Sequence, residues 1–134
     1  MKRSILAVIV GLVVWVLVVS LLNRGLRLGL TGYAAAEPAM TFTLGMKLAR
    51  LIIGALSSIA AGAVTAMMTR PKTSVPWVLG GILLLAFIPG HLRIWDKFPV
   101  WYHLTFLVTL APLVALGGWL TRSRPAHVSA PEAR

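Results

Sequence analysis

The chain contains no cysteine and only three acidic residues, and both absences exclude chemistry. Without cysteine there can be no disulfide, no thiolate metal site and no dithiol exchange of the kind that membrane thiol oxidoreductases use. The acids are Glu37, Asp96 and Glu132, and none lies inside an apolar run, so there is no membrane carboxylate to couple transport to protons or cations. Glycine-rich phosphate loops, serine-centred elbows and zinc motifs are also absent. We therefore expect no catalytic residue, no cofactor and no metal.

Charge of any kind is scarce. Charged residues make up 12% of the 134 residues and hydrophobic residues 58%, whereas a soluble domain is about 25% charged. A soluble domain of this size could not hide that much apolar surface, but a bilayer can. The net charge of +10 comes from basic residues in short groups between apolar runs, which is typical of helix ends at anionic headgroups. The composition predicts a membrane protein that binds the lipid bilayer and not nucleic acid.

Four apolar runs divide the chain. We expect spans over about 4–22, 44–69, 75–90 and 98–120 within one domain of residues 1–124, followed by a disordered tail over 125–134. The third run is expected to stop at Pro89-Gly90, and Pro112 should kink the fourth. The predicted fold is therefore all-α, an integral membrane four-helix bundle. A cleaved signal peptide is the rival interpretation of the first run, but that run is long for one.

An even number of spans places both termini on one side of the membrane. That side carries seven basic residues: Lys2, Arg3, Arg70, Lys72, Arg122, Arg124 and Arg134. The opposite side carries four, or six when two residues at the start of the second span are included: Arg24, Arg27, Arg93, Lys97, Lys47 and Arg50. The positive-inside rule then predicts that both termini are cytoplasmic, by a small margin.

Small residues recur on one broad side of the second span. The face consists of Gly54, Ser57, Ser58, Ala61, Gly62 and Thr65. Residues four apart share a helix face, and small faces let helix backbones approach closely in lipid. Three uses remain open: packing inside the monomer, association with a second copy or a partner membrane protein, and lining a substrate groove. Gly80-Gly81 and Gly117-Gly118 are candidate receivers for this face.

A second group of residues is basic and aromatic. Lys47 and Arg50 lie three residues apart near the start of the second span, where they must reach the headgroups, pair with an acid or line water. The only acids on that side are Glu37 and Asp96. A functional interpretation adds further residues from the segment between the third and fourth spans and predicts an anion or lipid-headgroup site of Lys47, Arg50, His91, Arg93 and His103. The spacing of the two histidines makes a poor metal site.

In layout the chain resembles short four-span bacterial inner-membrane proteins. The resemblance covers the whole length, through a Lys-Arg-flanked first span, AAEPAMTFTLGMKLARL entering the second and FPVWYHL entering the fourth. It implies a bacterial inner-membrane location and transfers no catalytic residue. Small multidrug transporters are similar in length but need an acid in the first span, and the signature of fluoride channels is not recognisable in this chain.

Three functions remain as hypotheses. The first is a non-enzymatic structural or accessory protein that acts through helix contacts on the small-residue face. The second is a small dimeric channel or transporter, for example of an anion, that uses Lys47 and Arg50. The third and weakest is a membrane enzyme that uses His91 or His103 on a lipid, which would need both histidines together with Asp96 in one pocket.

Overall fold

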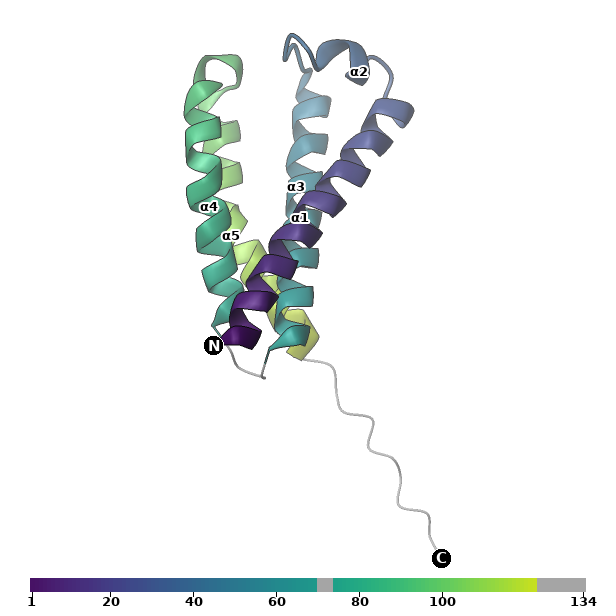
Figure 1. Cartoon of the computed structure of the whole chain (residues 1–134). Helices are drawn as coiled ribbons and strands as arrows, with labels where there is room; N and C mark the ends of the chain where they lie inside the picture. Colours follow the sequence, from purple (N-terminus) through teal and green to yellow (C-terminus); the bar gives the residue numbers. More distant parts are fainter. Residues whose placement is uncertain (70–73, 123–134) are drawn as a thin grey trace, which may run out of the picture.

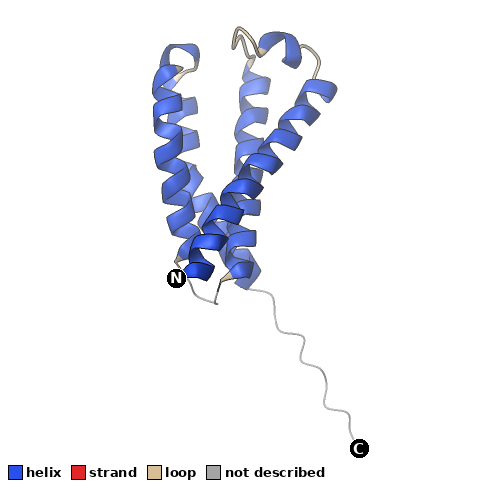
Figure 2. Ribbon diagram, viewed as in Figure 1, coloured by secondary structure: helices blue, strands red, loops and turns tan. Residues whose placement is uncertain are grey.

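The computed structural model describes residues 1–69 and 74–122, and over these residues the chain is helical with no strand (Figure 2). The four long helices are α1 (Lys2–Gly29), α3 (Leu44–Met68), α4 (Val75–Arg93) and α5 (Val100–Arg122). A short helix α2 (Tyr33–Ala36) lies between α1 and α3, and a single 3-10 turn η1 (Trp95–Lys97) joins α4 to α5. The predicted tail, residues 125–134, lies outside the described residues.

Each long helix is long and apolar enough to cross a membrane. Many large apolar side chains, among them Leu21, Leu85 and Val108, are more than 60% exposed on the outside of the bundle. A soluble protein would bury such residues, whereas lipid solvates them. The chain is a multi-pass membrane protein with an all-α, four-helix fold, as its composition predicted.

Two helices run further than their apolar patterns suggest. α1 continues past Leu22 to Gly29, so its last two turns carry Arg24 and Arg27 into what was expected to be a connection. α4 does not stop at Pro89-Gly90 but includes both and ends at Arg93. A proline removes only one helical hydrogen bond, and the last turn of α4 is completed by the bond from Ile94 N to the Gly90 carbonyl at 3.3 Å. The predicted stop at Pro89-Gly90 is therefore wrong.

The helices are arranged as two pairs that converge at one end (Figure 1). Helix α3 packs against both α1 and α5, and α4 packs mainly against α5. The N-terminus and the end of α5 lie at the converging end, whereas α2 and η1 lie at the opposite end, where the pairs splay apart (Figure 1). Pro112 lies within α5, and that helix changes direction about halfway along its length (Figure 1).

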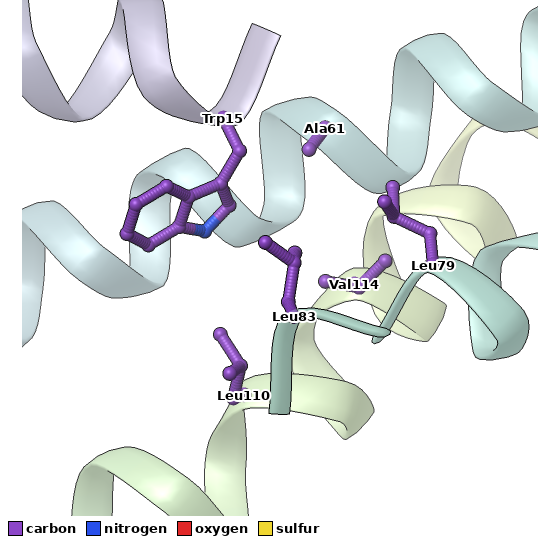
Figure 3. Close-up of a cluster of buried hydrophobic side chains, with 6 residues drawn as sticks. All are labelled: Trp15, Ala61, Leu79, Leu83, Leu110 and Val114. Atoms are coloured by element: carbon purple, nitrogen blue, oxygen red, sulfur yellow. The ribbon is translucent and has the colours of Figure 1, made fainter. Parts of the chain in front are cut away.

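Two apolar clusters hold this arrangement. The first brings side chains from all four long helices to the middle of the bundle (Figure 3): Trp15, Ala61, Leu79, Leu83, Leu110 and Val114. The second lies at the splayed end and joins α2, the start of α3 and the start of α5: Tyr33, Ala36, Phe42, Met46, Phe98 and Tyr102. The second cluster ties the connection after α1 to the connection before α5, so the splayed end has its own aromatic core.

Candidate functional site

The small-residue face of α3 is buried within the monomer. All six of its residues are buried, and α5 covers one side of them. A Cβ at Gly62 would collide with the backbone oxygen of Val114, and one at Gly117 would collide with the backbone oxygen of Ile59. Glycine at these two positions is what allows the backbones of α3 and α5 to touch. We call this converging end, with Gly11, Gly62, Thr65, Val114 and Gly117 at its contacts, the closed half.

Helix α1 covers the other side of the same face. The Thr65 hydroxyl contacts the Ala7 carbonyl at 3.4 Å while donating to its own helix at the Ala61 carbonyl at 2.8 Å. Further along, the Trp15 indole donates to the Ser58 hydroxyl at 3.1 Å. Since α1 and α5 lie on both sides of the face, most of it packs inside the monomer, and Gly54 at its upper end also lines the cleft described below.

Two glycine pairs, Gly80-Gly81 and Gly117-Gly118, were expected to pack against this face, and only the second pair does so. Gly117 packs on α3, as described above, and Gly118 lies against Pro76 and Ala66. Gly80 packs instead on Ala111 of α5, and Gly81 has no neighbour within 4 Å of an added Cβ. Of the first pair, only Gly80 therefore serves a helix contact, which is the one between α4 and α5.

A cleft of about 500 Å³ opens at the splayed end. All four long helices contribute to its wall, and the lining residues are Trp15, Val19, Ser20, Asn23, Glu37, Arg50, Ile53, Gly54, Phe87, Gly90, His91, Ile94, Tyr102 and Phe106. Arg50 is six residues into α3, which places it about 9 Å along the axis from that helix end. Trp15 bonds Ser58, about 21 Å along the same helix, so the cleft runs from a polar mouth toward an apolar floor near mid-membrane.

Arg50 is the central charge of the cleft. Its guanidinium donates to the Tyr33 hydroxyl at 2.7 Å and to the Tyr102 hydroxyl at 3.4 Å, and it lies 4.8 Å from the centre of the Phe42 ring. These neighbours position the group without neutralising it, because the phenols are uncharged partners. Among the described residues Arg50 forms no ion pair, so the alternatives in which it pairs with Glu37 or Asp96 are not realised.

Glu37 is held by a different arginine. Arg27 Nε contacts its carboxylate at 2.5 Å, and the Asn23 amide donates to the other oxygen at 3.1 Å. Asn23 also accepts from the Tyr33 hydroxyl at 2.7 Å, so one network joins Arg27, Glu37, Asn23, Tyr33 and Arg50 across the mouth of the cleft. The hydrogen bond from Arg27, with a smaller contribution from Asn23, lowers the pKa of the Glu37 carboxyl below its ordinary value.

The two histidines lie together on the α4–α5 side of the cleft. Their Nδ1 atoms are 2.8 Å apart, and Nε2 of His103 lies 3.3 Å from the Trp95 carbonyl oxygen. His103 is fully buried and stacks on the Trp95 ring at 4.6 Å, whereas His91 also lines the cleft. No third His, Cys, Asp or Glu joins the pair among the described residues, so the two rings alone do not make a metal site.

The remaining residues of the predicted anion site lie elsewhere. Lys47 is half-buried and Arg93 is exposed, and neither lines the cleft. Asp96 is exposed on η1, so it does not join the histidines as the enzyme hypothesis required. Of the five predicted residues, the structure brings Arg50 and His91 to one cleft, with His103 behind His91.

Four residues of the site were not identified from the sequence: Asn23, Tyr33, Phe42 and Tyr102. Asn23 and Tyr33 lie in the expected connection after the first span, and Tyr102 lies within the expected fourth span. A polar residue within the extended α1 would have been the one available signal, because such residues usually face the bundle interior.

No protein-family model, curated protein or solved structure matches this chain. What the cleft binds is therefore inferred from its own chemistry. That chemistry is a guanidinium without an ion pair among the described residues and a hydrogen-bonded imidazole pair, above a floor of Trp15, Phe87 and Phe106.

Proposed function

We propose that this protein binds an anionic amphiphile, a membrane phospholipid, in the cleft and is not an enzyme. The observation that carries the proposal is Arg50, a guanidinium held inside the cleft with no carboxylate partner among the described residues. A charge at that depth is unfavourable unless something neutralises it, and a phosphate oxygen pair suits the planar fork of arginine. In this proposal the ligand supplies the missing anion.

The depth and the lining favour a lipid over a soluble ion. Arg50 lies near the level where headgroups meet acyl chains, about 9 Å from the end of α3. Below it the wall is formed by apolar groups, among them Ile53, Phe87 and Phe106, which a small hydrated anion would leave in contact with water. A phospholipid places its phosphate at Arg50 and apolar chain atoms against the aromatic floor.

An anion channel remains the second candidate because it uses the same residue. The closed half argues against a path between α3 and α5, since the backbones of these helices touch at Gly62 and Gly117. Liposome flux measurements compare the candidates directly. Anion flux that depends on Lys47 and Arg50 would favour the channel, and an absence of flux together with lipid binding would favour the accessory role.

We also propose a location and an orientation. The layout of the chain supports the inner membrane of a bacterium, and the basic residues at the converging end support cytoplasmic termini. The cleft would then open in the outer leaflet. The chain lacks cysteine, so single cysteines introduced at Thr31 or Asp96 on one side and at Ser4 on the other can be labelled from outside intact cells. Labelling only at Thr31 and Asp96 is the expected result, and labelling only at Ser4 would reverse the orientation.

Lipid binding is tested by native mass spectrometry of the detergent-solubilised full chain. We expect phosphatidylglycerol to bind and phosphatidylcholine of the same chains to bind much less. Arg50→Met keeps an unbranched side chain but removes the guanidinium and its charge, and it should weaken phosphatidylglycerol binding about tenfold or more, as for loss of a charged hydrogen bond. Lys47→Met, on the same helix but outside the cleft, is the matched control and should bind as the wild type does.

Three results would contradict the proposal. They are equal binding of the two lipids, unchanged binding by the Arg50→Met variant, and an equal loss with Lys47→Met. Inorganic phosphate distinguishes the source of the anion. If it displaces the lipid at low millimolar concentration, the cleft is a site for a soluble anion, and if it does not, the apolar part of the ligand contributes to binding.

A further inference from the structure

The histidine pair gives the cleft a second recognition element, which the charge of Arg50 does not explain. We infer that His91 presents a hydrogen-bond acceptor to the ligand, so that the cleft selects anionic headgroups that carry a hydroxyl group. This inference rests on the proposed function, because it concerns which phospholipid the cleft binds. It assigns a specificity-determining residue and a ligand class to the site.

The tautomers follow from the partners of each ring nitrogen. A carbonyl oxygen only accepts, so His103 must donate to Trp95 from Nε2. With both rings neutral, Nδ1 of His103 is then an acceptor, and Nδ1 of His91 must carry the hydrogen that lies between the rings. The remaining nitrogen of His91, Nε2, is left with an unshared lone pair. The Trp95 carbonyl therefore determines the tautomer of His91 indirectly, through its hydrogen bond with His103.

That lone pair has no partner within the described part of the chain, where His91 forms its one hydrogen bond through Nδ1. Its ring is packed between aromatic neighbours, with the Phe106 centroid at 4.8 Å and the Tyr102 centroid at 6.3 Å. Since His91 lines the cleft, a ligand bound there can supply a donor to Nε2.

Arg50 and His91 line the same cleft, and both contact Tyr102. Tyr102 lies between them, because its hydroxyl accepts from Arg50 and its ring stacks against the His91 ring. One end of such a ligand must therefore be an anionic oxygen and the neighbouring group a neutral donor. A phosphodiester with a hydroxylated headgroup, as in phosphatidylglycerol, has this pattern. An alkyl headgroup has only the anion, and the quaternary ammonium of choline offers no N–H or O–H to Nε2. An ethanolamine headgroup has N–H donors, but it carries them on a positive charge that would lie beside Arg50.

The test compares two lipids that differ in hydroxyl groups alone. Phosphatidylglycerol and phosphatidylpropanol of the same acyl chains have the same charge and the same number of headgroup carbons. Offered in equal amounts to the wild-type chain in detergent, phosphatidylglycerol should be bound about fivefold more, which is the ratio expected for one net hydrogen bond. Equal occupancy of the two lipids would overturn the inference without requiring any variant.

Two variants locate the preference. His91→Phe removes the acceptor and should bind the two lipids equally, whereas His91→Gln retains an acceptor oxygen and should keep part of the preference. A preference that persists in His91→Phe would overturn the assignment to this residue. His103→Phe removes the partner that orients His91 and should weaken the preference while Arg50-dependent binding remains.

This inference and the proposed function fail in different ways. If both lipids bind equally and Arg50→Met abolishes both, the cleft is a phospholipid site without hydroxyl selection, and only the inference fails. If neither lipid binds, or if binding does not depend on Arg50, the proposed function fails as well.

Discussion

The same helices build both halves of this bundle, but they contact one another differently in each half. In the closed half, α3 touches α5 through glycine at Gly62 and Gly117, and the backbones themselves are in contact. At the splayed end, which we call the cleft half and which is lined by the cleft residues given above, the helices are separated by aromatic and polar side chains around a volume of about 500 Å³. Small residues bring helices together, and large residues with hydrogen-bonding groups hold them apart.

The two halves therefore have different roles along the membrane normal. The closed half supplies rigidity because its contacts are between backbones, which cannot change rotamer. In the cleft half, Arg50 and His91 form their hydrogen bonds with other side chains, so the helices that carry them need not touch through their backbones. Four substitutions test this difference between the two halves.

Gly62→Leu disrupts the contact between α3 and α5 in the closed half. Its first side-chain carbon already overlaps the Val114 backbone oxygen, so α3 and α5 must separate. We expect a loss of about 4 kcal/mol or more, seen as a large fall in melting temperature in detergent or as failure to fold. Gly81→Leu is the matched control, because nothing lies within 4 Å of a Cβ there. A Gly62→Leu variant as stable as the Gly81→Leu variant would contradict the backbone contact between α3 and α5.

Trp15→Phe tests the boundary between the halves. The change removes the buried hydrogen bond to Ser58 while keeping an aromatic ring against Phe87, so we expect the free energy of unfolding to fall by about 1 kcal/mol. Trp77→Phe, at an exposed position on the outside of α4, should have almost no effect. In a double-mutant cycle with Ser58→Ala, the two losses should be less than additive, and strict additivity would contradict the bond.

The Glu37 network predicts a pH dependence confined to the cleft half. Since the fold lowers the pKa of Glu37 below its ordinary value of 4.5, this carboxylate stabilises the protein above that pH, and its contribution is lost as the pH falls through the lowered pKa. Melting temperatures measured from pH 7 to pH 3 should show the wild type approaching the Glu37→Gln variant in acid. The effect should be small because Arg27 is largely exposed. A difference between the two proteins that does not change with pH would count against the network.

Met40 is the site of the smallest expected change. It lies in the connection between α2 and α3 with a φ of 54°, a left-handed conformation that asparagine tolerates better than methionine. Met40→Asn should raise stability by about 0.5 kcal/mol, whereas Met40→Ala should give no gain. Both variants should bind lipid as the wild type does. A loss of binding would show that this connection contributes to the cleft.

The sequence analysis was most successful where information is local. Apolar runs identified four helices because the bilayer imposes a length that any single run can be measured against. It also identified the small-residue face of α3, but not the use of that face, since the three alternatives differ only in what lies opposite. The end of α4 was missed for a related reason. Pro89 is a strong local stop signal, yet the turn that follows it persists alongside the contact of His91 with His103.

What the sequence determined by itself is therefore the class of protein: an all-helical chain with four spans, basic ends, no membrane carboxylate and a small-residue face on the second long helix. Only the tertiary structure decided that α1 and α5 cover that face, that Glu37 pairs with Arg27, and that Arg50, Tyr33 and Tyr102 share one cleft. The physical reason is that hydropathy and residue size act along one helix. The rotation and crossing of helices decide which of their side chains meet, and those depend on all the contacts at once.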